Sequence, residues 1–381
     1  MRSILYKAYA LSFNFFSRFP LKENRVALLS PHMAKFTDSL GEVENEFKRR
    51  GGFETVRISG ADIKPERPTG AIDAVKKCCR MISFFTRGAK KLAGSKYVFL
   101  NDNFMPMSEL KFNKKTVITQ LWHAEGAFKK FGLDLCLPED VRERVKKGNS
   151  RLDYVVCTSE NLRPIYASAF GVPVEKVVAL GSPRADKYVR SFKENSFDKD
   201  AFKQKFFNCA DKKIVLYAPT FRDDADDNKK ILDHFDFKKF SAELGEKYIV
   251  VLRLHPQIHG GISVPENVFD MTGYDNIDDL IQASDVLVTD YSSVCMDFSL
   301  LNKPTVFYAY DLDKFGAERQ FYFDYESYVP GSVAKTFDEL LTAIKNLEPD
   351  EEKIKKFTEI NFGINDGKAA ERICSLALKT K

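Results

Sequence analysis

The chain has 381 residues, of which 44% are hydrophobic and 30% charged; this is the composition of an ordinary folded protein and excludes a chain dominated by disorder. Lys and Arg number 59 against 54 Asp and Glu, and the net charge of +5 is too weak to indicate a nucleic-acid-binding protein without a clustered basic face. At roughly 100–200 residues per domain, the length predicts two domains.

The amino-terminal segment, residues 3–19, is strongly apolar and ends before Pro20. It is interrupted by Lys7 and is shorter than the roughly 20 residues that a membrane-spanning helix needs. On a helix, Lys7 and Arg18 share a polar stripe while apolar side chains cover the rest. We therefore expect residues 1–20 to form an amphipathic helix that associates with an anionic membrane surface. A helix packed on its own domain and a signal peptide are the alternatives, although no small-residue cleavage site follows.

Short apolar runs alternate with amphipathic stretches, which is typical of parallel sheets covered by helices. A charged stretch, Arg190–Lys213, divides them. We expect an α/β fold with two doubly wound, Rossmann-like domains, residues 21–190 and 191–350, facing a central cleft, and helices in residues 351–381 that pack back toward the first domain. The predicted strands are Arg25–Leu29, Tyr97–Leu100, Thr116–Leu121, Tyr154–Cys157, Val177–Leu180, Ile214–Tyr217, Tyr248–Leu252, Val286–Thr289 and Thr305–Tyr308.

The seven cysteines show no metal-ligand spacing, and an odd number cannot pair completely within the chain, so we interpret them as reduced thiols of a cytosolic protein. No P-loop, nucleophile elbow or paired glycosidase-like carboxylates appear. The acidic residues Asp223, Asp224, Asp226 and Asp227 could hold a divalent metal, but a solvated loop is the favoured interpretation. No cofactor and no essential metal are expected.

The first segment whose side chains could take part in a reaction follows the predicted strand that ends at residue 121. It places His123 in a loop beside Trp122, the only tryptophan. An imidazole titrates near neutral pH and can accept a hydroxyl proton, so His123 is a candidate general base, although a single His is more often structural. Glu125 could orient the imidazole or act as the base itself. Lys129 and Lys130 could contact phosphate groups.

Two further segments follow predicted strands of the second half. The segment Tyr-Ala-Pro-Thr-Phe-Arg brings Thr220 and Arg222 together, a hydroxyl and a guanidinium that suit a phosphate, although an ordinary strand exit is an equal alternative. The segment Arg-Leu-His-Pro places Arg253 and His255 where they could neutralise a diphosphate.

The fourth segment, Thr-Asp-Tyr-Ser-Ser, reads as a strand, a turn rich in capping residues and an amphipathic helix. Because a helix amino terminus presents free N–H groups, Ser292 and Ser293 could bind phosphate oxygens there, with Asp290 in the preceding turn. Simple helix capping is the alternative.

These four segments, in this order, resemble the CDP-glycerol glycerophosphotransferase family of teichoic acid synthesis, whose motifs run like Trp-His-Gly-Thr-x-x-Lys-x-x-Gly, Tyr-Ala-Pro-Thr-x-Arg, Arg-x-His-Pro and Thr-Asp-Tyr-Ser-Ser. The similarity extends through Asn302-Lys303-Pro304 and Tyr310-Asp311-Leu312, so it covers most of residues 115–320. The resemblance implies a GT-B architecture. It also implies transfer of glycerol phosphate, or another alditol phosphate, from CDP-glycerol or CDP-ribitol to a lipid-linked disaccharide, with CMP as the leaving group.

The resemblance also implies roles for single residues, with the departure from Gly-Thr to Ala124 and Glu125 leaving the acceptor open. His123, His255 and Arg253 would be catalytic. The donor-binding residues would be Thr220, Arg222, Arg253, His255, Asp290, Ser292 and Ser293, and the acceptor side would hold Trp122, Glu125, Lys129 and Lys130.

The size is similar to that of the priming enzymes of this family, which predicts a primase at the cytoplasmic face of the bacterial cell membrane, bound peripherally and without a nucleic-acid partner. A polyglycerol- or ribitol-phosphate polymerase and a GT-B glycosyltransferase that uses a nucleotide sugar are the enzymatic alternatives. A non-catalytic partner in envelope assembly is a third, and the oligomeric state, with a homo-oligomer among the options, is open.

Overall fold

The computed structural model describes residues 2–31, 36, 38–59, 70–209, 211–222, 224–254, 265 and 267–380. The chain forms two compact units, which are described separately below. Unit 1 comprises Met1–Glu125, Phe131–Lys187 and Phe362–Lys381, and unit 2 comprises Gly126–Lys130 and Tyr188–Asn361.

Unit 1 is built on a sheet of six strands in the order β2-β1-β3-β4-β5-β6, and each neighbouring pair is parallel. The central strands form because their residues are continuously apolar and buried, as parallel strands covered on both faces require. The strands are β1 (Lys22–Ser30), β2 (Glu54–Ser59), β3 (Ser95–Leu100), β4 (Val117–Gln120), β5 (Tyr154–Cys157) and β6 (Val177–Ala179).

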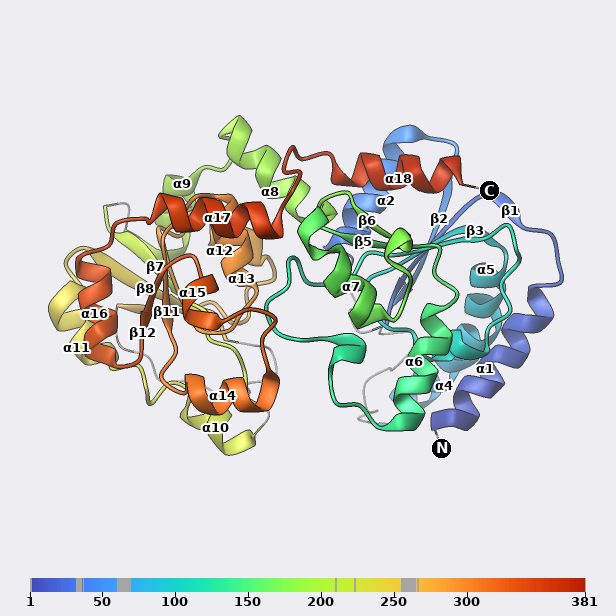
Figure 1. The fold of residues 1–381 in the computed structure, drawn as a ribbon, viewed down its shortest axis with the longest axis horizontal. Helices are drawn as coiled ribbons and strands as arrows, with labels where there is room; N and C mark the ends of the chain where they lie inside the picture. The colour runs from blue at the N-terminus through green and yellow to red at the C-terminus, as the bar shows by residue number, and fades with distance from the viewer. Residues whose placement is uncertain are drawn as a thin grey trace. The chain divides into compact units, whose positions relative to one another are not determined.

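In unit 1, the carboxyl-terminal helix α18 packs against α2, which lies near the start of the chain. In Figure 1, α18 runs beside α2, and Arg50 of α2 donates hydrogen bonds to the Glu371 carbonyl and the Ser375 hydroxyl, each 2.8 Å long. Phe47 and Ile373 lie in the same hydrophobic cluster. The helices are α1 (Arg2–Phe16), α2 (Ser39–Arg50), α4 (Ala71–Ser83), the π-helical turn η1 (Phe84–Gly88), α5 (Ala89–Ala93), η2 (Met105–Glu109), η3 (Gly132–Asp134), α6 (Glu139–Asn149), η4 (Glu160–Leu162), α7 (Arg163–Phe170), η5 (Val174–Lys176) and α18 (Ala369–Lys379), while α8 (Pro183–Glu194) continues into unit 2.

The sheet of unit 2 also has six parallel strands, in the order β12-β11-β10-β7-β8-β9. Chain order reverses direction between β7 and β10, so this is the doubly wound arrangement in which ligands bind at the carboxyl ends of the two strands where the order switches. The strands are β7 (Lys213–Tyr217), β8 (Tyr248–Leu252), β9 (Val268–Asp270), β10 (Val286–Thr289), β11 (Thr305–Tyr308) and β12 (Ser332–Ala334).

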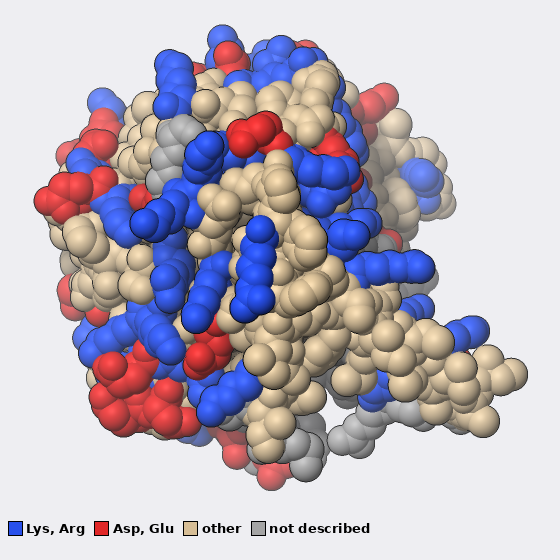
Figure 2. Space-filling model, turned by 90° about the vertical axis from the view of Figure 1, so that its right-hand side faces the viewer, with Lys and Arg blue, Asp and Glu red and all other residues tan. Residues whose placement is uncertain are grey.

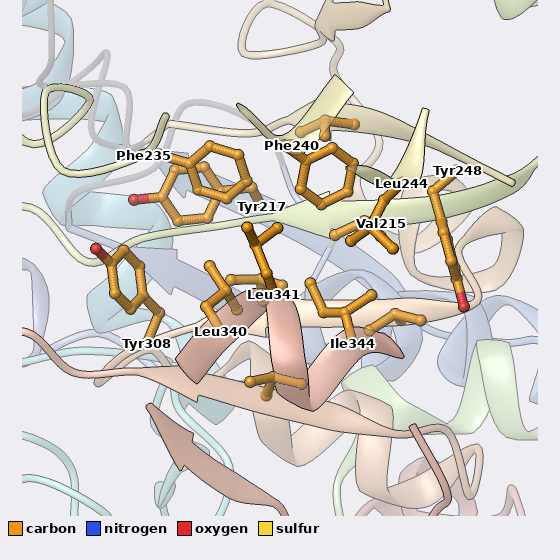
Figure 3. Packing of buried hydrophobic residues seen from close by; sticks show 14 of the residues in the cluster. Val215, Tyr217, Phe235, Phe240, Leu244, Tyr248, Tyr308, Leu340, Leu341 and Ile344 are labelled. Atoms are coloured by element: carbon orange, nitrogen blue, oxygen red, sulfur yellow. The ribbon is translucent and has the colours of Figure 1, made fainter. Parts of the chain in front are cut away.

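One core of unit 2 packs helix α16 against the sheet. Figure 3 shows Leu340, Leu341 and Ile344 of α16 directed toward Val215 of β7, in a cluster that also contains Phe240. The helices of this unit are α9 (Lys199–Phe207), α10 (Ala225–Lys230), α11 (Phe237–Leu244), α12 (Ile277–Ala283), α13 (Val294–Leu300), α14 (Leu312–Arg319), α15 (Tyr325–Tyr328), α16 (Phe337–Lys345) and α17 (Glu351–Asn361).

The predicted fold class, α/β with two parallel doubly wound sheets, is confirmed. All nine predicted strands are present, and β2, β9 and β12 are additional. Residues 351–381, expected as one group of helices, are divided, because α17 belongs to unit 2 and α18 to unit 1.

The predicted amino-terminal helix corresponds to α1, which packs on unit 1 through Tyr9 and Phe13, both essentially inaccessible to solvent. The Tyr9 ring stacks on Phe84 with centroids 4.5 Å apart. In contrast, Leu11 and Phe15 are 75% and 53% exposed. Within the described residues, no helix has the length and apolar character needed to cross a bilayer. The association of α1 with a membrane stays a prediction.

Candidate active site

The carboxyl ends of β3 and β4 bring His123 next to Asp102. Because these strands are parallel neighbours, the residues that follow them meet at one edge of the sheet. His123 Nδ1 lies 3.3 Å from the Asn101 carbonyl oxygen and 3.6 Å from a carboxylate oxygen of Asp102. The imidazole is 45% exposed, and we find no partner for Nε2 among the described residues. With Nδ1 bonded as a donor, Nε2 is the nitrogen that can accept a proton from a substrate.

Trp122 fixes the direction in which His123 leaves the strand. Its backbone has a φ of 61°, a left-handed conformation that is rare for a bulky residue, and its N–H donates to the side-chain oxygen of Gln120 at 3.0 Å. The buried indole stacks on Phe131, with centroids 5.2 Å apart, and lies against the His123 ring at 4.1 Å. Trp122 therefore acts as a buried support for the imidazole, and strained backbone of this kind concentrates at functional sites.

Glu125 is held away from the imidazole by other partners. It is 5% exposed, accepts a hydrogen bond from the Ser182 hydroxyl at 2.7 Å and forms an ion pair of 2.9 Å with Arg184. Among the described contacts, none joins Glu125 to His123. The group placed to orient the imidazole is Asp102, which none of the four sequence motifs contains.

The second cluster lies in unit 2, where the ends of β7 and β10 meet at the switch in strand order. The Thr220 N–H donates to one carboxylate oxygen of Asp290 at 2.8 Å, and the Arg222 guanidinium pairs with the other at 2.9 Å. Arg222 also pairs with Asp311 at 2.7 Å, and Asp311 accepts a hydrogen bond from Tyr291 at 2.9 Å. Three separate loops are thus joined by one cation and two carboxylates.

Arg222 is enclosed by this cluster. Its side chain is 5% exposed, and its guanidinium carbon lies 5.1 Å from the centre of the Phe315 ring and 5.3 Å from that of Tyr291. Burial alone would lower the pKa of Arg222, but the charges of Asp290 and Asp311 raise it above its ordinary value. Arg222 was expected to bind the CDP-alditol directly. In the structure its guanidinium is instead engaged by Asp290 and Asp311 and holds the loops in place.

Thr220 offers the free group in this cluster. Its hydroxyl is buried and has no hydrogen-bond partner within the described structure. A buried hydroxyl without a partner is uncommon, and a ligand oxygen would satisfy it.

Lys129 and Lys130 belong to unit 2, not to the unit of Trp122 and His123, where they were expected. The reason is backbone pairing, because the Lys130 N–H donates to the Gln320 carbonyl at 3.0 Å and the Tyr322 N–H donates to the Phe128 carbonyl at 3.1 Å. Burial lowers the pKa of Lys129 to about 8, although the charge of Asp290 acts in the opposite direction. Lys129 is therefore a cation beside the Thr220–Asp290 loops.

The other residues that were predicted to bind the CDP-alditol have fewer groups available for a ligand. Arg253 is half-buried and donates to the carbonyl oxygens of Met271 and Tyr274, at 2.8 and 2.6 Å, and burial lowers its pKa. Ser292 accepts a long hydrogen bond of 3.4 Å from the Val294 N–H, and Ser293 makes no side-chain cap to α13. His255 lies outside the described residues.

Among the acidic residues considered as a metal site, Asp224 serves as a helix cap, and Asp223 lies outside the described residues. Asp224 accepts hydrogen bonds from the N–H groups of Asp226 and Asp227, at 2.8 and 3.0 Å, and so begins α10. Across the described part of the chain, no group of three or more His, Cys, Asp or Glu side chains is arranged to hold a metal ion.

Comparison with known proteins agrees with this arrangement. Residues 11–379 match the model of the family described as CDP-glycerol:poly(glycerophosphate) glycerophosphotransferase. The chain is 31% identical to the teichoic acid poly(ribitol-phosphate) polymerase of Bacillus spizizenii over 380 residues, 98% of this chain and 59% of that protein. It is 34% identical to the teichoic acid ribitol-phosphate primase of the same species and 33% identical to the teichoic acid glycerol-phosphate primase of Bacillus subtilis, with coverage of 74% and 73% of this chain and 74% and 72% of those proteins.

Among solved structures, a variant of the wall teichoic acid polymerase TagF soaked with CDPG has a TM-score of 0.79 and 22% identity, over 98% of this chain and 93% of that chain. A UDP-GlcNAc 2-epimerase from Neisseria meningitidis has the same general fold, with a TM-score of 0.58 and 13% identity over 93% of this chain and 100% of that chain. The fold is therefore GT-B-like. On the evidence of the family match and these relatives, the chain belongs to the CDP-glycerol:poly(glycerophosphate) glycerophosphotransferase family.

Proposed function

We propose that the chain transfers an alditol phosphate from a CDP-alditol to a hydroxyl of a lipid-linked disaccharide, releasing CMP, and that it primes the synthesis of a teichoic acid or a related envelope polymer. The observation that carries this proposal is the His123 imidazole, whose Nδ1 is bonded while Nε2 is open. Membership of the glycerophosphotransferase family supports the choice of reaction.

In the proposed mechanism, His123 Nε2 removes the proton from the acceptor hydroxyl as its oxygen attacks the phosphorus that carries the alditol. The bond from that phosphorus to CMP breaks, and CMP leaves with the electron pair. Asp102 stabilises the imidazolium that forms. Phosphoryl transfer depends chiefly on alignment and on neutralisation of charge, which Lys129, Arg253 and His255 would supply, with Thr220 binding a phosphate oxygen.

Polymerisation is the second candidate, because the ribitol-phosphate polymerase of Bacillus spizizenii matches 98% of this chain. The chain spans 59% of the length of that polymerase and 74% of the length of the ribitol-phosphate primase, and these relatives support priming and polymerisation equally. Transfer of a sugar from a nucleotide sugar, the other enzymatic alternative, is disfavoured by the family match.

The direct test is an assay of CMP release and product mass. Purified protein is supplied with CDP-glycerol or CDP-ribitol in parallel, together with a lipid-linked ManNAc-GlcNAc disaccharide analogue. A product heavier by one alditol phosphate supports priming, and a ladder of products indicates polymerisation. Absence of transfer from both donors contradicts the proposal, and nucleotide release from a sugar donor would then favour the glycosyltransferase alternative.

We also propose that unit 1 binds an anionic membrane surface through the exposed sides of α1 and α4. Besides Leu11 and Phe15, the exposed apolar side chains there include Ile72 and Val75 of α4, a helix in which no residue is buried. Figure 2 shows Lys and Arg side chains gathered around uncharged surface on the face of the molecule that carries α1. Apolar side chains surrounded by cations are the pattern of an interfacial helix, and this arrangement would hold the enzyme near a lipid-linked acceptor.

This membrane proposal is tested with a Leu11→Ser, Phe15→Ser double variant, because both side chains are exposed and their loss should not unfold unit 1. Co-sedimentation with vesicles containing about one-third anionic lipid should decrease severalfold. The matched control is Phe192→Ser in unit 2, where the ring is 54% exposed. Unchanged sedimentation of the double variant, or an equal decrease in the control, would contradict the assignment.

A further inference from the structure

A small pocket lies beside His123, entirely within unit 1. It is lined by the residues that follow β4, β5 and β6, among them His123, Glu125, Thr158 and Ser182. Its volume is about 10 Å³, and about 10–15 Å³ on this scale is the room that one water molecule needs. The pocket can therefore hold a single group the size of a hydroxyl.

Most polar side chains around this pocket already have partners within the protein. The Tyr166 hydroxyl donates to the Ala124 carbonyl at 3.2 Å, the Ser182 hydroxyl to Glu125 at 2.7 Å, the Cys157 thiol to the Ser159 carbonyl at 3.2 Å, and the Ser39 hydroxyl accepts from the Arg184 N–H at 3.2 Å. Each of these groups therefore already takes part in a hydrogen bond within the protein.

Thr158 is the exception. It is 5% exposed, and its hydroxyl has no hydrogen-bond partner in the described structure. Leaving a buried hydroxyl unpaired is energetically unfavourable, so such a group is expected to be paired when the site is filled. Thr158 and His123 thus both line this pocket, and Thr158 brings to it a buried hydroxyl that has no partner among the described residues.

We propose that this pocket binds one hydroxyl group of the acceptor, with Thr158 Oγ1 as its hydrogen-bond partner, and that the bound hydroxyl places the acceptor against His123 Nε2. A hydroxyl both donates and accepts, as Thr158 does, whereas an anionic group would face the Glu125 carboxylate on the same wall. The inference rests on the proposed function and deepens it by assigning a residue that recognises the acceptor.

The test compares Thr158→Val, which removes the hydroxyl at nearly constant volume, with Thr158→Ser, which keeps it. We expect Thr158→Val to raise the KM for the acceptor about 3- to 10-fold, the worth of one neutral hydrogen bond, without a change in the KM for the CDP-alditol. Thr158→Ser should stay within about twofold of the parent protein. The control is Thr116→Val, which removes a buried hydroxyl that donates to the Ser95 carbonyl at the start of β4.

The outcomes separate the two proposals. No transfer by the parent protein contradicts the proposed function itself. Normal transfer by the parent with an unchanged acceptor KM in Thr158→Val overturns the hydroxyl site alone, as does an equal effect of Thr116→Val. Hydrolysis of the CDP-alditol can be measured as CMP release without acceptor. If Thr158→Val lowers this hydrolysis as much as it lowers transfer, the pocket binds water, and the acceptor site is overturned.

Discussion

The two candidate sites use charge in opposite ways. In unit 2, Arg222 is almost completely buried and forms ion pairs with Asp290 and Asp311, so its charge holds the loops together. In unit 1, His123 is nearly half exposed and only one of its ring nitrogens is engaged. The difference shows that a motif residue with strong chemistry can be either structural or reactive, and that burial together with the number of satisfied donors decides which.

The largest effect is expected when the buried cation of unit 2 is removed. Arg222→Met leaves Asp290 and Asp311 buried without their partner, and loss of one member of a buried ionic cluster typically costs about 3–5 kcal/mol. We expect the free energy of unfolding to fall by about that amount in urea titrations. The control is Lys314→Met, which removes an exposed pair with Asp227 and should leave the free energy of unfolding nearly unchanged. Equal losses in the two variants would contradict a structural role for Arg222.

The next largest effect is expected when the Asp102 carboxylate, which supports the imidazole in unit 1, is removed. Asp102→Asn keeps the size of the side chain but deprives the His123 imidazolium of its counter-charge. Because general base catalysis contributes about 10²–10⁴-fold, we expect kcat to fall at least about tenfold with little change in the KM for the donor. Asp140→Asn, at an exposed position of α6, serves as the control. A kcat within twofold of the parent value would remove Asp102 from the mechanism.

The smallest effect concerns pH and Lys129. Burial lowers its pKa to about 8 in the folded protein, whereas the ordinary value is 10.5. Between these values the unfolded state binds more protons, so this residue makes the free energy of unfolding rise as the pH increases above about 8, and contributes no pH dependence below it. We expect Lys129→Met to flatten that rise in urea titrations at pH 7.5, 8.5 and 9.5. A parallel pH dependence in both proteins would show that Lys129 keeps an ordinary pKa.

Sequence patterns located the strands at the centres of both sheets but missed three at the edges. Tyr154–Cys157, Tyr248–Leu252, Val286–Thr289 and Thr305–Tyr308 were predicted to the residue, because buried parallel strands are continuous apolar runs. The missed strands β2, β9 and β12 each lie at the edge of a sheet. With Arg57 exposed in β2 and only three residues each in β9 and β12, their apolar signal is too weak to recognise.

The candidate site was predictable only where a residue and its motif adjoin in sequence. His123 follows its strand directly and could be identified. Asp102 could not, since its link to His123 depends on the pairing of β3 with β4. The ion pair of Glu125 with Arg184, and the attachment of Lys129 to unit 2, likewise arise from tertiary contacts that no local pattern records.

The central claim is that His123 is the base of an alditol phosphate transfer, and His123→Ala tests it most directly. The measurement is CMP release with acceptor present, alongside titration of CDP-alditol binding, with the exposed His234→Ala of unit 2 as the matched control. We predict a fall in turnover of about 10²–10⁴-fold with donor affinity unchanged, and parent-like turnover in the control. Near-normal turnover in His123→Ala would contradict the account.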